Sequence, residues 1–106
     1  NGIDYNINIG DFSSLYDGKN SKDIESLNNE YIRDYTSSLN INGIKNNVDQ
    51  FKGIKAVYYE NLQNGVISKA VYFHYYDKAY MIQVSSKDNV NNAFEKFAST
   101  FELIKK

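Results

Sequence analysis

The chain has 106 residues, the length of one domain, and 42% of them are hydrophobic, including 10 Tyr and 6 Phe, so the composition is that of a globular protein. Its 12 basic and 13 acidic residues leave a net charge of −1, and Arg33 is the only arginine, which argues against nucleic-acid binding because phosphate contacts need a basic face. The absence of cysteine excludes disulfides, thiolate catalysis and the usual structural zinc sites. No apolar run reaches the roughly 18 residues of a membrane span.

The first twenty residues predict a strand and a loop. Apolar residues occupy every second position from Ile3 to Ile9, a period of two that predicts a strand with one buried face. Residues 10–20 contain Gly, Asp and Ser and predict a loop. We expect Phe12, Leu15 and Tyr16 to hold this loop against the body of the domain.

Residues 21–39 predict a helix that Asn20 or Ser21 caps, since apolar residues recur there at spacings of three and four. Asn40 and Gly43 predict its end, and residues 41–48 predict a weak strand. The apolar stripe of the helix consists of Ile24, Leu27, Tyr31, Ile32, Tyr35 and Leu39, whereas Asn28, Asn29, Glu30 and Arg33 lie away from it.

Residues 53–85 predict a three-stranded antiparallel meander. Asn64-Gly65 is the preferred centre of a two-residue type I′ hairpin, and the resulting register places Glu60 opposite Lys69, a favourable cross-strand pair. A second turn is expected at Asp77-Lys78. Both turns place one apolar set on a single face: Ile54, Ala56, Tyr58, Leu62, Ile67, Val71, Phe73, Tyr75, Tyr80, Ile82 and Val84.

The last predicted element is an amphipathic helix that begins near Asp88 as its cap. Its stripe follows spacings of 3, 4, 7, 8 and 11 from the first member, so this helix belongs to the core. The stripe consists of Val90, Ala93, Phe94, Phe97, Ala98 and Phe101. The order of elements predicts an α+β fold, an antiparallel β-sheet with an N-terminal and a C-terminal helix packed on it.

Two segments resemble the PsbP-like family, which contains the extrinsic photosystem II subunit and bacterial lipoprotein domains. They are the strand Lys78-Ala79-Tyr80-Met81-Ile82 after a long hairpin, and the closing helix Asn92-Ala93-Phe94-Glu95-Lys96-Phe97-Ala98-Ser99-Thr100-Phe101. The resemblance implies a single PsbP-like α/β sandwich over residues 1–106, outside the cytoplasm and often lipid-anchored, with no enzymatic activity and no cofactor. A cystatin-like helix-on-sheet domain satisfies much of the same pattern.

The second face of the meander carries the candidate binding residues. It mixes rings with polar groups, and tyrosine is favoured at interfaces because it supplies rigid apolar area and a hydroxyl group. We therefore expect either an exposed binding surface or cover by a helix or loop. The proposed surface consists of Tyr59, Tyr72, His74, Tyr76 and Met81.

These features favour a non-catalytic binding or accessory domain of an extracytoplasmic bacterial lipoprotein, whose partner is a protein or a small ligand. The abundance of Asn, Ile, Lys, Tyr and Phe, all with AT-rich codons, points to a Gram-positive bacterium. One alternative is a cytosolic immunity or antitoxin-like protein that binds another protein. A second is a small hydrolase that uses His74, although a catalytic base needs a positioned partner and a cleft. No spacing of acidic residues matches a metal site.

Overall fold

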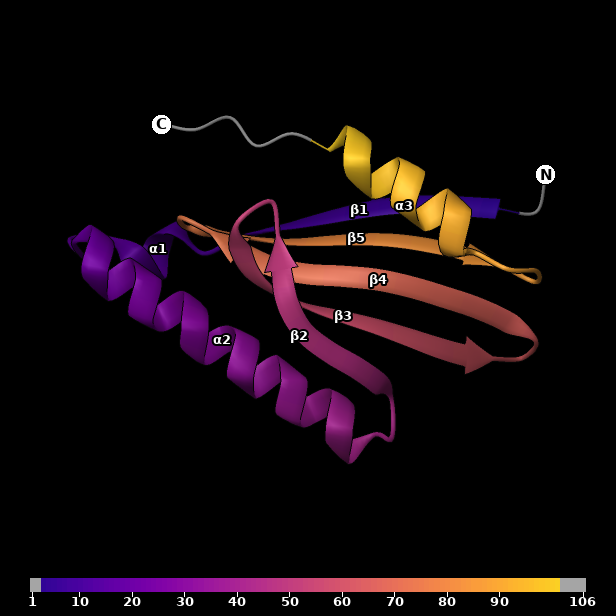
Figure 1. Cartoon of the computed structure of the whole chain (residues 1–106). Helices are drawn as coiled ribbons and strands as arrows, with labels where there is room; N and C mark the ends of the chain where they lie inside the picture. The colour runs from indigo at the N-terminus through magenta and orange to yellow at the C-terminus, as the bar shows by residue number, and fades with distance from the viewer. Residues whose placement is uncertain (1–2, 102–106) are drawn as a thin grey trace.

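The computed structural model describes residues 3–101, which form a five-stranded antiparallel sheet with a helix on each face (Figure 1). The strand order is β1-β5-β4-β3-β2. The elements are β1 (Ile3–Asp11), α1 (Ser13–Tyr16), α2 (Ser21–Ile41), β2 (Lys45–Phe51), β3 (Ile54–Gln63), β4 (Val66–Tyr75), β5 (Lys78–Ser86) and α3 (Asn91–Thr100). The α+β class is confirmed. The chain begins with a strand, as the period of residues 3–9 predicted, so the N-terminal helix of the predicted arrangement is α2, which follows this strand and is not the terminal element.

Helix α2 carries the chain from one edge of the sheet to the other, because β1 and β2 are the two edge strands. The helix begins as predicted, with the Asn20 side chain accepting a hydrogen bond from the Asp23 backbone N–H at 2.9 Å. It ends just before Gly43, whose φ of +70° lies in the left-handed region that glycine adopts without strain. In Figure 1, α2 lies below the sheet and α3 lies above it.

The first hairpin of the meander has the predicted turn and register. Asn64 and Gly65 have φ angles of +54° and +78°, as a type I′ turn requires. Glu60 lies opposite Lys69, and Ala56 lies opposite Phe73.

The second hairpin turns one residue earlier than predicted. Tyr75 pairs with Lys78, so the turn residues are Tyr76 and Asp77, and Tyr76 takes a positive φ of +53°. The turn is held by contacts from distant parts of the chain, because the Phe12 backbone N–H donates to the Asp77 carbonyl oxygen at 2.7 Å. The partner of Tyr75 is therefore Lys78 and not the predicted Tyr80, a shift of two residues in the pairing. An even shift leaves every side chain on its predicted face.

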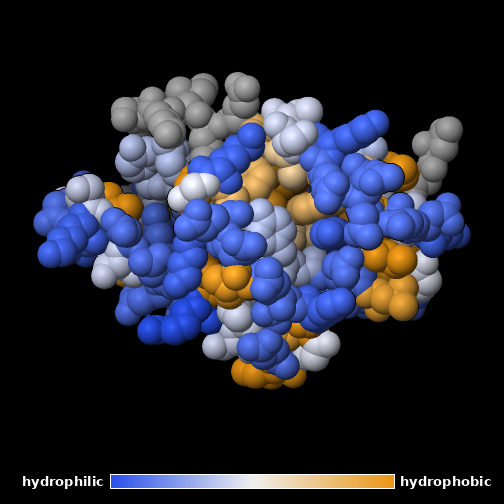
Figure 2. All heavy atoms as spheres, viewed as in Figure 1, coloured by the Kyte–Doolittle hydropathy of each residue, from blue (hydrophilic) through white to orange (hydrophobic). Residues whose placement is uncertain are grey.

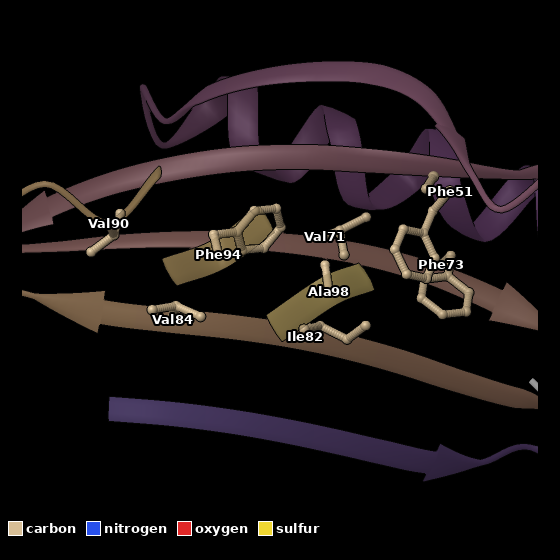
Figure 3. Packing of buried hydrophobic residues seen from close by; sticks show 9 residues of the cluster. Phe51, Val71, Phe73, Ile82, Val84, Val90, Phe94 and Ala98 are labelled. Carbon is tan, nitrogen blue, oxygen red and sulfur yellow. The ribbon is translucent and has the colours of Figure 1, made fainter. Parts of the chain in front are cut away.

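Side chains of α3 and of one sheet face form the main core (Figure 3). Phe73 at its centre is fully buried, and its ring lies 5.1 Å from Phe51 and 5.2 Å from Tyr80, centroid to centroid. The predicted apolar face is confirmed except at Leu62, which is exposed beside the hairpin turn. The predicted stripe of α3 is also confirmed, with these members in or against the core: Val90, Ala93, Phe94, Phe97, Ala98 and Phe101.

Two predicted boundaries and one predicted contact are wrong. Helix α3 begins at Asn91, and Asp88 is not its cap, because the segment before the helix is held by side-chain bonds from Ser86 and Asn89. The weak strand is β2, at Lys45–Phe51, because the polar residues after α2 first complete its C-terminal turn. In the predicted loop Tyr16 is buried and Phe12 half-buried as expected, whereas Leu15 is exposed on the outside of the short helix α1.

Strand β1 has the predicted period but only part of the predicted burial. Its apolar side chains share a face with those of β5, and Ile3 packs against the core. Further along, Tyr5, Ile7 and Ile9 are 53%, 40% and 60% exposed. Helix α3 has ten residues, a length of about 15 Å, so it covers the inner strands and leaves this edge open.

Candidate functional site

Five rings fill the space between α2 and the second face of the sheet. We call this set the ring layer: Tyr31 and Tyr35 from α2, Tyr59 from β3, and Tyr72 and His74 from β4. Tyr35 stacks on Tyr72 with ring centroids 3.9 Å apart, and Tyr31 stacks on His74 at 4.8 Å. Residues four apart lie on the same face of a helix, so each tyrosine of α2 meets one ring of β4.

Hydrogen bonds join the polar tips of these rings. The Tyr72 hydroxyl lies 2.7 Å from His74 Nε2. The Tyr59 hydroxyl donates to Met81 Sδ at 3.0 Å and lies 2.9 Å from the Tyr35 hydroxyl. Buried polar groups stay favourable only when they are paired, and these pairs satisfy the hydroxyl groups.

His74 is the buried titratable group of this face. It is 2% exposed, and burial lowers its pKa to about 4, so the ring is neutral at pH 7. Burial raises the pKa of the neighbouring Tyr72 to about 12, with smaller contributions from nearby tyrosines. His74 Nδ1 is buried and has no hydrogen-bond partner among the described residues. An unpaired buried nitrogen is costly, so its position bears on function.

The structure brings together four of the five residues that the sequence suggested. Tyr59, Tyr72, His74 and Met81 share one sheet face, as the register predicted. The alternative of an exposed surface is wrong for His74, which is buried. Tyr59, Tyr72 and Met81 are half-buried, because α2 covers this face. Cover by a helix was the other alternative, and it is confirmed. Tyr76 lies apart in the β4–β5 turn and is 41% exposed.

A groove of about 510 Å³ opens beside the ring layer, between the first half of α2, the β2–β3 turn and the end of β4. His74 lies in its wall, next to Tyr75 and Tyr76. Its Nε2 lies against the Tyr72 hydroxyl, and the Phe12 ring packs edge-on against the imidazole with centroids 5.2 Å apart, so Nδ1 is covered although the residue lines the groove. Besides Tyr75 and Tyr76, the polar residues that line the groove are Ser21, Glu25, Asn28, Asn29, Gln50, Lys55 and His74.

Tertiary contacts fix the shape of this groove. Asn28 accepts a hydrogen bond from the Tyr16 hydroxyl and donates one to the Tyr76 carbonyl oxygen at 3.3 Å. These bonds tie α1, α2 and the β4–β5 turn together. On the opposite wall the β2–β3 turn uses Lys52 and Gly53, both with positive φ. The walls therefore come from segments that are far apart in the sequence.

The contacts of His74 bear on the alternative of a small hydrolase. In the described part of the chain, His74 forms its only hydrogen bond with Tyr72, and no carboxylate orients the imidazole. A histidine that acts as a base needs a second group to hold its tautomer and stabilise the charge that it takes up. Within residues 3–101 no three His, Asp or Glu side chains gather in a way that could hold a metal ion.

Sequence reasoning missed the helix side of the site. Tyr31 and Tyr35 were assigned to the apolar stripe, and their stacking on particular rings of β4 followed only from the crossing of α2 over the sheet. Asn28 was placed away from the stripe, yet it faces the end of the sheet and is half-buried. A usable signal existed, because Asn28, Tyr31 and Tyr35 follow helical spacings of three and four.

The described helices include none with the length and apolar character needed to cross a membrane. Comparisons of this chain with protein-family models, with curated proteins and with solved structures found no match.

Proposed function

We propose that this chain is a non-catalytic domain that binds a small polar ligand in the groove beside His74. The observation that carries the proposal is a buried histidine that lines an open groove and whose covered Nδ1 has no hydrogen-bond partner among the described residues. A ligand in the groove that displaces the cover of Nδ1 and bonds to it removes the cost of the unpaired nitrogen, and this gain is available only when the ligand is bound.

The size and charge of the groove support this class of ligand. Its volume of about 510 Å³ is within the usual range for small-molecule sites. One carboxylate, Glu25, and one ammonium group, Lys55, balance each other, while Asn29 and Gln50 supply both donors and acceptors. A small uncharged or zwitterionic molecule fits this lining better than a strongly charged one.

Nuclear magnetic resonance tests the groove directly. The probes are a panel of small amides, polyols and amino acids, each titrated into the uniformly ¹⁵N-labelled protein. We expect at least one probe to shift the imidazole nitrogen signals of His74 together with the amide signals of Asn29 and Gln50. Shifts confined to residues outside the groove, or no shifts with any probe, contradict the proposal.

Matched variants show whether binding uses this lining. Lys55→Ala removes the ammonium group of the groove, and Lys45→Ala removes one from the exposed outer strand β2. For a probe that carries a carboxylate, a charge-assisted hydrogen bond contributes about 1.5–3 kcal/mol, so Lys55→Ala weakens binding about tenfold or more. Lys45→Ala leaves binding unchanged, and equal losses in the two variants contradict the assignment.

The PsbP-like arrangement and a place outside the cytoplasm, with a lipid anchor upstream, belong to the same proposal. The order of strand, long helix, antiparallel meander and closing helix supports the resemblance. The reading frame upstream of Asn1 provides the test. A signal peptide followed by a lipid-acceptor cysteine supports this location. A start codon directly before Asn1, with no signal peptide, contradicts it.

A further inference from the structure

The outer edge of β1 is open in the described part of the chain. Strand order places β1 at the end of the sheet, with β5 as its one neighbour. In an antiparallel strand every second residue directs its backbone N–H and C=O groups away from the existing neighbour. Ile3–Asp11 therefore presents a row of hydrogen-bonding groups at this edge that can pair with another strand.

The two edges of the sheet differ in the features that normally prevent such pairing. Strand β2 is short, carries Lys45 and Asp49 on exposed positions, and turns steeply across the other strands in Figure 1. The side of the molecule on which β2 lies is mostly hydrophilic, with its hydrophobic residues in separate patches (Figure 2). Strand β1 has nine residues, charged side chains only at Asp4 and Asp11 near its two ends, and no interruption in its ladder with β5. Between Asp4 and Asp11, β1 has less of the usual protection of an edge than β2.

The exposed side chains of β1 form a self-complementary pattern. We infer that β1 pairs antiparallel with β1 of a second copy of this chain, about a two-fold axis that passes midway between Ile7 and the Ile7 of that copy. In this register Tyr5 lies opposite Ile9 of the second copy, and Asn6 lies opposite Asn8. Asp4 lies opposite Gly10, so no two like charges face each other. Ile3 lies opposite Asp11 at the end of the pair. Over the central residues 5–9, apolar residues thus meet apolar residues on one face, and amides meet amides on the other.

The two-fold axis also accounts for the exposed apolar side chains. It is perpendicular to the sheet, so the faces that carry α3 lie on the same side of the joined sheet. Tyr5 already contacts Phe97 of α3, with ring centroids 5.0 Å apart. Ile7 and Ile9 of both copies then fill the space between the two α3 helices. The apolar surface that α3 leaves open within one chain is covered by the second chain.

Analytical ultracentrifugation of the full chain tests the association. The wild-type mass is expected to rise from 12.2 kDa toward twice this value as the concentration increases from micromolar to millimolar. Ile7→Lys places two like charges on the axis, and we expect it to stay monomeric throughout. Because Ile7 is 40% exposed, the variant keeps its fold, which circular dichroism verifies. A wild-type chain that remains monomeric at millimolar concentration overturns the inference.

Single cysteines test the register, since the chain has none of its own. Ile7→Cys places a thiol on the axis, within reach of the same thiol in the second copy, and a short bismaleimide crosslinker should join the two. Asp11→Cys lies on the same strand, yet its copy is about 27 Å away along the pair. Val48→Cys on β2 reports random collisions. We expect at least tenfold more crosslinked dimer for Ile7→Cys than for either control.

Similar yields for the three cysteine variants overturn the pairing. The inference is also overturned if the full chain stays monomeric and dimers form only after residues 102–106 are removed. Those residues would then be the occupant of this edge. The groove beside His74 lies at the other side of the sheet, so neither result depends on whether the groove binds a ligand.

Discussion

The two faces of this sheet are covered in different ways. On one face α3 packs phenylalanine and aliphatic side chains against fully buried residues such as Val71 and Ile82. On the other face α2 packs tyrosines against rings whose polar tips form hydrogen bonds. Apolar burial has no direction, whereas each bond of the ring layer requires a particular partner at a particular distance. The second face is therefore the one on which a group such as His74 Nδ1 can be left unpaired.

The largest effect is expected on the apolar face. Phe73→Ala removes a fully buried ring that contacts Phe51 and Tyr80, and the cavity that remains costs about 3–5 kcal/mol in the free energy of unfolding. Urea denaturation measures this loss, which is a large part of the about 5–15 kcal/mol typical of a whole domain. Leu62→Ala, at an exposed position on the same face, should change stability by less than about 0.5 kcal/mol. Equal losses in the two variants would show that the core is elsewhere.

The same substitution on opposite faces gives the next largest effect. Tyr72→Phe removes the hydroxyl group from His74 Nε2 and leaves both ring nitrogens unpaired, at a cost of about 1–3 kcal/mol. Tyr58→Phe, on the α3 face, removes an exposed bond to the Gln50 carbonyl oxygen, and water replaces it with a loss under about 1 kcal/mol. Urea denaturation compares the two. A loss for Tyr72→Phe no larger than that for Tyr58→Phe contradicts the role of pairing in the ring layer.

The pH dependence of stability isolates the histidine. The pKa of His74 falls from 6.5 to about 4 in the folded protein, so between these values the unfolded chain binds more protons. The contribution of neutral His74 to the free energy of unfolding is fully present above pH 6.5. It decreases as the pH falls from 6.5 and is lost once the pH passes about 4. The expected loss is on the order of 1–2 kcal/mol, within the upper bound that 1.36 kcal/mol per pKa unit sets for this shift. His74→Phe should flatten this part of the profile, and an unchanged profile contradicts the assignment.

The smallest effect sharpens the picture of the ring layer. Tyr35→Phe keeps the stacking on Tyr72 and removes one hydroxyl group from the pair with Tyr59. Tyr59 retains Met81 Sδ as its acceptor, so the loss should be about 0.5–1 kcal/mol. Thermal unfolding followed by circular dichroism is sensitive enough to detect it. A loss above that of Tyr72→Phe would mean that the hydroxyl pair, and not the histidine, controls this face.

Local sequence patterns were sufficient to predict the elements and the buried side chains where one face of an element is buried. The alternation of β3 and β4 and the spacing of α3 each mark a buried side, and Asn64-Gly65 fixes the first turn through its positive φ angles. The second turn has no residue of this kind. It moved by one position because backbone and side-chain bonds from Phe12 and Asn28 hold it, and such bonds leave no trace in the residues of the turn itself.

The amino-acid sequence alone determined the α+β class, the meander, the parity of its faces and the residues that α3 buries, because these follow from the periods of helix and strand. Only the tertiary structure decided that α2 covers the second face, that His74 lies neutral beside a groove, and that β1 leaves its apolar side chains exposed at an edge. Each of these depends on which segments, distant in the chain, come to lie beside one another, and hydrophobic patterning specifies that a face is buried without specifying what buries it.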